Sequence, residues 1–208
     1  MRVIAIAKPR TVAERKIIDE MHRLRARIFQ GRLSWNVRCV AGREYDEFDD
    51  LVPTYIVTLA DRGTVIGCAR LLPADGKTML GAVFPHLLRD GRLPAHRHMV
   101  ESSRFCVDTA CEEGRAQGQL HAATLTMFAG IVEWCMANGY TEIATATDVR
   151  FERILKRAGW PMRRLGEPVL INETRSVAGI LPADAASFNC LRPDGYCSAI
   201  PALRQRAA

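Results

Sequence analysis

The sequence predicts an α/β or α+β domain, and three observations support this class. Short apolar runs with the alternation typical of strands occur in turn with longer runs of helical spacing. Hydrophobic residues make up 48% of the 208 residues, which is enough for a substantial core. No internal repeat, linker or low-complexity block interrupts the chain. We therefore expect a single domain over residues 1–208, with a loop-rich tail over residues 182–208.

The first half of the chain is expected to form one helix and three strands around a long loop. Thr11 and Glu14 have the spacing of a capping box and predict the start of a helix that runs to about Phe29. Residues 61–63 carry a hairpin signal between two strands. Residues 30–53 have few regular signals, and a loop of this length is usually functional or disordered. The expected strands cover residues 2–7, 55–59 and 64–72.

The second half alternates further strands and helices. Gly139 and Gly159 follow runs of helical spacing and predict two helix ends. Asp148 predicts the start of the second of these helices. The expected strands cover residues 99–107, 142–147 and 168–173, and the expected helices cover residues 83–88, 121–138 and 148–158.

Composition restricts the compartment and the partners. The seven cysteines are odd in number and scattered, with no C-x-x-C pair, which favours a reducing cytoplasm over a disulfide framework. No apolar run reaches the length of about 18 residues that a membrane span needs, and the N-terminus lacks the features of a signal peptide. The net charge of +6 fits an acidic protein or an anionic small molecule at least as well as DNA. No cluster has the spacing of a metal site.

Residues 100–105 place a carboxylate and a guanidinium, those of Glu101 and Arg104, in a strand that is expected to be buried. Unpaired charges there would be costly, so they are either paired or used in function. Regular alternation puts the two side chains on opposite faces, and a bulge in the strand would bring them to one site. The alternative is an ion pair of Glu101 with Arg25 or Arg70 that serves only the scaffold.

Two of these arginines are expected beside apolar residues. Arg70 shares the alternation face of Ile66, Cys68 and Leu72, and a lone arginine on an apolar face needs an anion. Arg25 borders the apolar stripe of its helix. It is expected either at the helix surface or in a buried pair with an acidic residue.

An acidic cluster spans residues 44–50. It is either a solvated loop or, because Tyr45 and Phe48 tie it to the core, a set of carboxylates that faces one pocket. Asp46 and Asp49, three residues apart, would suit a cationic substrate such as an amine or a sulfonium. They could equally hold arginine side chains in place.

Two further motifs concern an acyl donor. Residues 115–120 partly match the R-x-x-G-x-G/A loop that presents backbone amides to a pyrophosphate in Gcn5-type N-acetyltransferases, with Leu120 in place of the last small residue. Four basic residues of the helix expected over residues 148–158 form either a solvated face or a docking patch for an acidic protein. They are Arg150, Arg153, Lys156 and Arg157.

Taken together, these residues resemble the acyl-homoserine-lactone synthase, or autoinducer synthase, family. The resemblance covers roughly residues 1–175. Its motifs are Met21-His22-Arg23-Leu24-Arg25-x-x-x-Phe29, Leu33-Ser34-Trp35, Glu44-x-Asp46-x-Phe48-Asp49, Gly67-x-x-Arg70-Leu71-Leu72, Phe84-Pro85 and Glu101-x-Ser103-Arg104-Phe105. No single motif is decisive, but the order and spacing of the set are specific.

The resemblance implies a fold similar to that of the Gcn5-type N-acetyltransferases, with three layers and a mixed, V-split sheet flanked by helices. It implies an acyltransferase that joins S-adenosylmethionine to an acyl group carried as a thioester on acyl carrier protein or on CoA. The products would be an N-acyl-homoserine lactone, which is a quorum-sensing signal, and 5′-methylthioadenosine. S-Adenosylmethionine is a substrate in this reaction, so neither a cofactor nor a metal is expected.

The resemblance also implies roles for individual residues. Glu101 is the candidate general base for the substrate amine, directly or through a water. The charged residues expected to shape the S-adenosylmethionine pocket are Arg25, Asp46, Asp49, Arg70 and Arg104. The residues expected to bind the substrates are Phe29, Trp35, Ser103, Phe105, Thr145 and Thr147, of which Thr147 stands where a hydroxyl accompanies a 3-oxo acyl group. The carrier would dock on Arg150, Arg153, Lys156 and Arg157.

Two other functions fit parts of the sequence. The first is an acyl-CoA-dependent N-acetyltransferase of the Gcn5-related type, although the incomplete loop at residues 115–120 and the acidic cluster argue against it. The second is a non-enzymatic nucleic-acid-binding domain, which the sequence pI of 9.1 suggests. The chain lacks a helix-turn-helix pattern and an aromatic platform for that role. Release of methylthioadenosine would identify the lactone-forming reaction.

Overall fold

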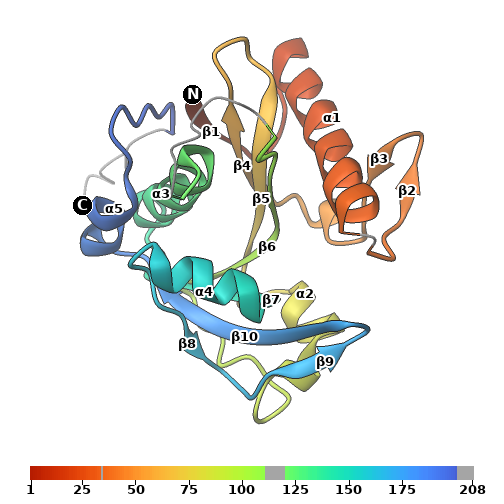
Figure 1. Cartoon of the computed structure of the whole chain (residues 1–208), viewed down its shortest axis with the longest axis vertical. Coiled ribbons are helices and arrows are strands. Elements are labelled where there is room, and N and C mark those ends of the chain that lie inside the picture. The colour runs from red at the N-terminus through yellow and green to blue at the C-terminus, as the bar shows by residue number, and fades with distance from the viewer. Residues whose placement is uncertain (34, 111–119, 201–208) are drawn as a thin grey trace.

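Figure 1 shows the computed structural model of the chain, which describes residues 1–33, 35–110 and 120–200. Its largest sheet contains β1 (Arg2–Ile6), β4 (Thr54–Leu59), β5 (Val65–Pro73), β6 (Met99–Val107), β7 (Glu142–Asp148), β10 (Thr174–Pro182) and β8 (Arg163–Arg164) in that order, with β9 (Val169–Ile171) also paired to β10. A separate hairpin contains β2 (Cys39–Val40) and β3 (Arg43–Glu44). The helices are α1 (Val12–Ala26), α2 (Met79–Val83), α3 (Ala122–Ala137), α4 (Val149–Arg157) and α5 (Ala185–Leu191). Shorter helical turns cover Arg27–Arg32, Asp49–Leu51 and Pro85–Leu87.

The large sheet is mixed and split in a V, as the resemblance implied. β6 and β7 are parallel neighbours, whereas the other described strand pairs of this sheet are antiparallel. The pairing of β6 with β7 ends at Ser102 and Thr145. Since β6 continues to Val107 and β7 to Asp148, the two strands separate over their last residues. The sheet is therefore split at this point.

Helices cover both faces of the sheet (Figure 1). α3, α4 and α5 lie on one face, where Phe128 and Leu155 belong to the largest cluster of buried apolar residues. α1 lies on the opposite face, where Met21 and Leu24 pack against Val57 and other residues of β4 and β5. α2 lies on the face of α1, near the end of the sheet that contains β9. The result is the three-layer arrangement that we expected.

Most of the predicted elements are confirmed close to their predicted bounds, including the capping box of α1. The Thr11 hydroxyl accepts a hydrogen bond from the Glu14 amide at 3.1 Å, and the Glu14 carboxylate accepts one from the Thr11 amide at 3.0 Å. The short helix predicted over residues 83–88 is confirmed in part by the helical turn Pro85–Leu87. α2, which begins at Met79, was not predicted, and the signal that was missed is Thr78, whose hydroxyl caps it.

β10 and α5 were not predicted. β10 is paired on both edges, and its residues 177–181 are buried on both faces, so their sequence shows no alternation. The expectation of a loop-rich tail from residue 182 is wrong for α5. Asp184 caps this helix by accepting a hydrogen bond from the Ser187 amide at 2.7 Å.

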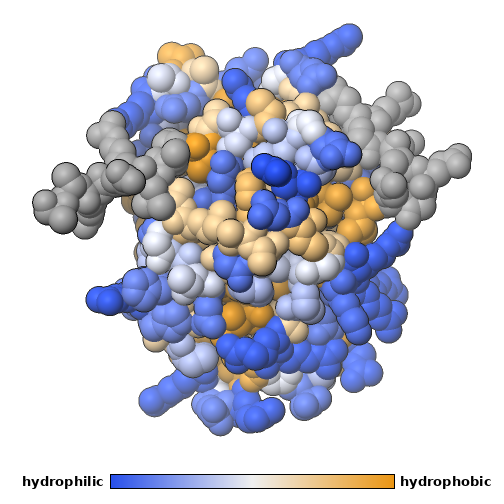
Figure 2. Space-filling view, turned by 90° about the vertical axis from the view of Figure 1, so that its left-hand side faces the viewer, coloured by the Kyte–Doolittle hydropathy of each residue, from blue (hydrophilic) through white to orange (hydrophobic). Residues whose placement is uncertain are grey.

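The surface agrees with the mixed composition of the chain. In the view of Figure 2, hydrophilic side chains surround smaller hydrophobic patches. Within the part of the chain that the structure describes, no helix combines the length and the apolar character that a bilayer crossing would require. The partial pyrophosphate-loop motif over residues 115–120 falls outside the described residues except for Leu120.

Candidate active site

A backbone irregularity brings Glu101 and Arg104 to the same face of the sheet. The side chains of Glu101 and Ser103 face α2 and Arg70, as regular alternation requires. The pairing of β5 with β6 then shifts register between Cys68 and Arg70, and Arg104 takes a φ of +53°, a value that is uncommon for a residue with a side chain. The guanidinium of Arg104 is thereby directed to the face of Glu101, which confirms the predicted bulge.

A second irregularity corrects the expected surroundings of Arg70. In the pairing of β4 with β5, Thr58 is opposite Gly67 and Leu59 is opposite Val65, so Ile66 is an extra residue. Ile66 therefore belongs to the core beneath α3 and not to the face of Arg70. The prediction that these two residues share a face is wrong, because a bulge reverses the alternation between them.

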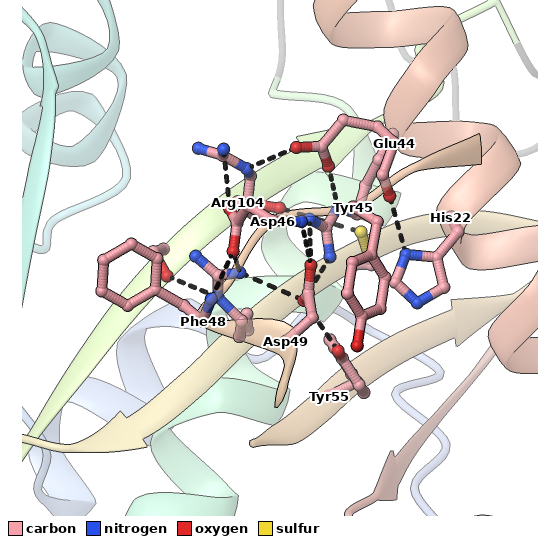
Figure 3. A network of polar contacts seen from close by, with 12 residues as sticks. His22, Glu44, Tyr45, Asp46, Phe48, Asp49, Tyr55 and Arg104 are labelled. Carbon is pink, nitrogen blue, oxygen red and sulfur yellow. Dashed lines mark hydrogen bonds and ion pairs between the residues drawn. The ribbon is translucent and has the colours of Figure 1, made fainter. Parts of the chain in front are cut away.

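Arg25 belongs to a buried ion-pair network with Glu44 and Asp49, two residues that Figure 3 labels. Its side chain is fully buried, and its guanidinium donates two hydrogen bonds to the Asp49 carboxylate, at 2.8 and 2.9 Å. It also forms an ion pair with the Glu44 carboxylate, which is fully buried as well. The Tyr55 hydroxyl donates to Asp49 at 2.7 Å. The alternative of a solvated Arg25 is thus wrong, and the buried pair with an aspartate is confirmed.

The other two arginines extend the network towards β6. Arg70, also fully buried, contacts Asp46 at 2.5 Å and Asp49 at 3.1 Å, and donates to the Ser103 hydroxyl at 3.1 Å. Arg104 forms ion pairs with Glu44 at 3.0 Å and with Asp46 at 2.7 Å. The acidic cluster is therefore a set of carboxylates that hold arginine side chains, and its reading as a solvated loop is wrong for these three residues.

The electrostatics of the network follow from its geometry. Burial by itself would raise the pKa of Asp49, but the hydrogen bonds and the charge of Arg25, together with the charge of Arg70, hold that pKa well below its usual range. Burial would likewise lower the pKa of Arg25, yet its contacts with Asp49 and Glu44 raise it above its usual value. Both groups therefore stay charged in the folded protein. Three guanidinium groups face three carboxylates in this network.

Glu101 is a fourth carboxylate, and it is held differently. It is almost fully buried, and its oxygens accept hydrogen bonds from the backbone amides of Met79 at 3.0 Å and Leu80 at 2.5 Å, at the first turn of α2. Burial raises the pKa of Glu101, although these hydrogen bonds and the charge of Arg70 oppose the rise. Among the ion pairs of the described residues, none joins Glu101 to Arg25 or Arg70, so the predicted scaffold pair is wrong.

Aromatic side chains lie beside the arginines of the network. The rings of Phe29 and Trp35 are stacked, with centroids 5.2 Å apart and an angle of 4° between their planes. The Arg104 guanidinium lies over the Phe29 ring, 5.7 Å from its centroid, and that of Arg70 lies over Phe48 at 5.4 Å. Phe29 is buried and Trp35 is partly exposed. Arg70 and Arg104 thus each have an aromatic ring against the guanidinium.

A narrow apolar pocket with a cavity volume of about 20 Å³ lies on the opposite face of β6. Its lining residues are Ser102, Phe105, Phe128, Ile131, Ile143, Thr145, Phe151, Leu155, Trp160 and Leu181. The Thr145 hydroxyl donates to the Ser102 carbonyl at 2.9 Å. Thr147 follows two residues later on β7 and is half-buried, but it is not among the lining residues. Because the pairing of β6 with β7 ends at Ser102 and Thr145, the pocket lies beside the split in the sheet.

The four basic residues predicted to dock a carrier lie on α4 and are exposed; they are Arg150, Arg153, Lys156 and Arg157. Asp148 caps this helix as predicted, through hydrogen bonds of 2.7 Å from the amides of Arg150 and Phe151. α4 follows directly after β7, so the basic residues belong to the element next to the split.

Sequence reasoning left three contributors out of the candidate site: Glu44, Tyr55 and Met79. Glu44 was part of the acidic cluster, but nothing in its local sequence showed that it would be the fully buried member. The Met79 sulfur contacts the guanidinium of Arg104 at 3.3 Å and that of Arg70 at 3.8 Å. A methionine or a tyrosine in an apolar segment carries no local signal for such a role.

The split sheet places a buried network of charged side chains beside an apolar pocket. Comparisons with known proteins identify the family. The profile of the autoinducer synthase family matches residues 10–191. The chain is 57% identical over 198 residues to the acyl-homoserine-lactone synthase of Agrobacterium fabrum (strain C58 / ATCC 33970), covering 95% of this chain and 94% of that protein. It is 58% identical over 200 residues to a probable acyl-homoserine-lactone synthase of Sinorhizobium fredii (strain NBRC 101917 / NGR234), covering 96% of each.

Solved structures have the same fold. The acyl-homoserine-lactone synthase LasI superposes with a TM-score of 0.76 at 30% identity, covering 91% of this chain and 94% of that chain. The CoA-dependent synthase BjaI, solved with SAM and isopentyl-CoA, superposes with a TM-score of 0.83 at 24% identity, covering 97% and 94%. The chain therefore belongs to the autoinducer synthase family. It is an acyl-homoserine-lactone synthase, a transferase that makes quorum-sensing signals.

Proposed function

We propose that this synthase makes N-acyl-homoserine lactones from S-adenosylmethionine and an acyl thioester, without a cofactor or a metal. The observation that carries the proposal is Glu101, a carboxylate close to Arg70. It adds a negative charge to a network in which three other carboxylates already match three arginines. With Glu101 ionised, the site has a net negative charge. This charge suits S-adenosylmethionine, which has a sulfonium, an ammonium and only one carboxylate. The SAM in the BjaI structure supports the choice by analogy of fold.

In the first step, the amine nitrogen of S-adenosylmethionine attacks the thioester carbonyl carbon. The carbon–sulfur bond of the thioester breaks, so the acyl group passes to nitrogen and a thiol leaves. Glu101, directly or through a water, takes the proton that the ammonium must lose before its nitrogen can attack, and passes it to solvent. The second proton, which the nitrogen loses as the amide forms, ends on the departing sulfur. The raised pKa of Glu101 brings this carboxylate closer to the operating pH, where a base is most effective.

In the second step, the carboxylate oxygen of the homoserine part attacks the γ-carbon that carries the sulfonium. That carbon–sulfur bond breaks, and 5′-methylthioadenosine leaves with the electron pair. No proton needs to move in this step. Arg25, Asp46, Asp49, Arg70 and Arg104 shape the pocket in which the substrate folds back on itself. The stacked rings of Phe29 and Trp35 keep water away from it.

The acyl chain lies in the apolar pocket on the opposite face of β6, and the reacting carbonyl lies at the split. Ser103 and Phe105 stand on opposite faces of β6, one towards the charged network and one towards the pocket. A hydrogen bond from the Thr147 hydroxyl to a ketone is the basis for a preference for 3-oxo acyl groups, with Thr145 as its neighbour on the same face.

The donor is an acyl group on acyl carrier protein, delivered on phosphopantetheine in the cytoplasm. Its support is the exposed basic side chains of α4, the element next to the split, because acyl carrier proteins are acidic. CoA is the second candidate carrier, and BjaI and MesI, both described as CoA-dependent, share the fold.

The experiment that tests the proposal supplies the purified protein with S-adenosylmethionine and matched acyl-carrier and acyl-CoA thioesters. Mass spectrometry follows the lactone and methylthioadenosine. We expect both products in equal amounts, with the faster rate for the carrier thioester. Acyl transfer to an amine without release of methylthioadenosine would instead establish a plain N-acetyltransferase and overturn the proposal.

A further inference from the structure

The first turn of α2 divides its backbone amides between two side chains. The amides of Met79 and Leu80 donate to the two oxygens of Glu101, at 3.0 and 2.5 Å. The next amide, that of Gly81, donates to the Thr78 hydroxyl at 3.1 Å. The amides at the start of a helix have no partner within the helix, so they need acceptors of this kind. Thr78 and Glu101 thus complete the turn together.

We propose that Thr78 is a positioning residue for Glu101, and that its hydroxyl fixes the turn whose amides hold the carboxylate. α2 has only five residues, and so short a helix is unstable by itself. The Thr78 side chain is 5% exposed, so water does not readily replace its hydroxyl as the acceptor for Gly81. The inference rests on the proposed role of Glu101 as the base.

The packing around the hydroxyl supports this assignment. A Cβ atom built on Gly81 would lie 3.0 Å from the Thr78 hydroxyl oxygen, which is closer than most contacts of this kind. Glycine lowers the stability of a helix relative to alanine, so its presence here fits a turn that must leave room for the hydroxyl. The Met79 sulfur contacts Arg104 at 3.3 Å and Arg70 at 3.8 Å, so the same turn also sets Glu101 relative to the network.

The expected consequence is a change in the pH profile. The charged groups that face Glu101 from the neighbouring elements are Arg70 and Asp46, and α2 itself contains no titratable residue. The two amide hydrogen bonds favour the ionised carboxylate, so their loss raises the pKa of Glu101. In Thr78→Val, we expect the acid limb of kcat/KM to move up by about one pH unit. At a pH below both limbs, kcat/KM should then fall about tenfold, whereas KM for S-adenosylmethionine should change little.

The matched control is the N-cap of α1. Thr11 accepts a hydrogen bond of 3.1 Å from the Glu14 amide, the same arrangement as at Thr78, but it is exposed and remote from Glu101. Thr11→Val should lower the melting temperature and leave the acid limb in place. Thr78→Ser keeps the hydroxyl and should restore the wild-type limb.

Two assays separate this inference from the proposed function. Methylthioadenosine release gives the pH profile, and a ¹³C NMR titration of the Glu101 carboxyl, assigned with Glu101→Gln, gives its pKa without catalysis. A raised carboxyl pKa in Thr78→Val with recovery in Thr78→Ser supports the inference, even if wild-type protein forms no lactone and the proposed function fails. An unchanged carboxyl pKa in a folded Thr78→Val, or an equal shift in Thr11→Val, overturns it.

Discussion

Replacing Asp49 by asparagine tests the buried network most directly. The Asp49 carboxylate accepts hydrogen bonds from Arg25 at 2.8 and 2.9 Å, from the Tyr55 hydroxyl at 2.7 Å and from the Asp46 amide at 2.9 Å. Asparagine would remove one charge from between two fully buried arginines and present an NH₂ group to other donors. Removing one partner of a buried ion pair typically costs about 3–5 kcal/mol, because the remaining charge is left uncompensated.

The assay is urea unfolding of Asp49→Asn beside Asp50→Asn. Asp50 is the matched control, since it is the next residue, undergoes the same chemical change and is exposed, with a hydrogen bond from the Tyr45 hydroxyl. Its substitution should change the free energy of unfolding by about 0.5 kcal/mol or less. A difference below about 1 kcal/mol between the two variants would refute the view that these charges depend on one another.

The pH dependence of this loss has a definite sign. Since the pKa of Asp49 lies below its usual range in the folded protein, the unfolded chain binds the proton first as the pH falls. The stabilisation by Asp49 is therefore complete above the ordinary aspartate pKa of about 3.9. It is lost as the pH falls through the lower pKa of the folded protein. Asp49→Asn should lose less stability than the wild type over that acid range.

Three further predictions concern catalysis. Glu101→Gln should lower kcat for methylthioadenosine release by about 10²–10⁴-fold. Because the pKa of Glu101 is raised, the acid limb of the wild-type pH profile should lie above the ordinary glutamate pKa of about 4.3. Thr147→Val should lower the ratio of turnover of 3-oxo to unsubstituted acyl donors, measured by competition; an unchanged ratio would argue against the hydrogen bond. Arg153→Glu should raise KM for acyl carrier protein more than KM for S-adenosylmethionine. The control Arg62→Glu, at the exposed hairpin turn, should change neither KM. Equal effects of the two charge reversals on KM for the carrier would exclude a docking role for Arg153.

Much of the fold followed from local signals. The capping box of α1, the hairpin between β4 and β5 and the bounds of β6 were predicted because each depends on residues close together in the chain. β10 was missed because burial on both faces removes the alternation that identifies a strand. α2 was missed because its start depends on a single buried threonine.

The sequence by itself determined which charges must be accounted for. Arg70, Glu101 and Arg104 stand in segments too apolar to leave them solvated, and this much could be read without coordinates. For Arg25 the sequence left a position at the helix surface open. The family motifs added which of these residues belong to one site.

Only the tertiary structure decided the partner of each charge. A positive φ at Arg104 and a register shift in the pairing of β5 with β6 direct Arg104 to carboxylates of the same network as Arg70. Glu101 instead accepts hydrogen bonds from the first turn of α2. Glu44 becomes fully buried because α1 and β6 approach it from either side. These pairings join residues 19 to 60 positions apart in the chain. Ion-pair energies depend on the distance and the burial of both groups, and for groups so far apart in sequence these quantities are set by the packing of the whole sheet.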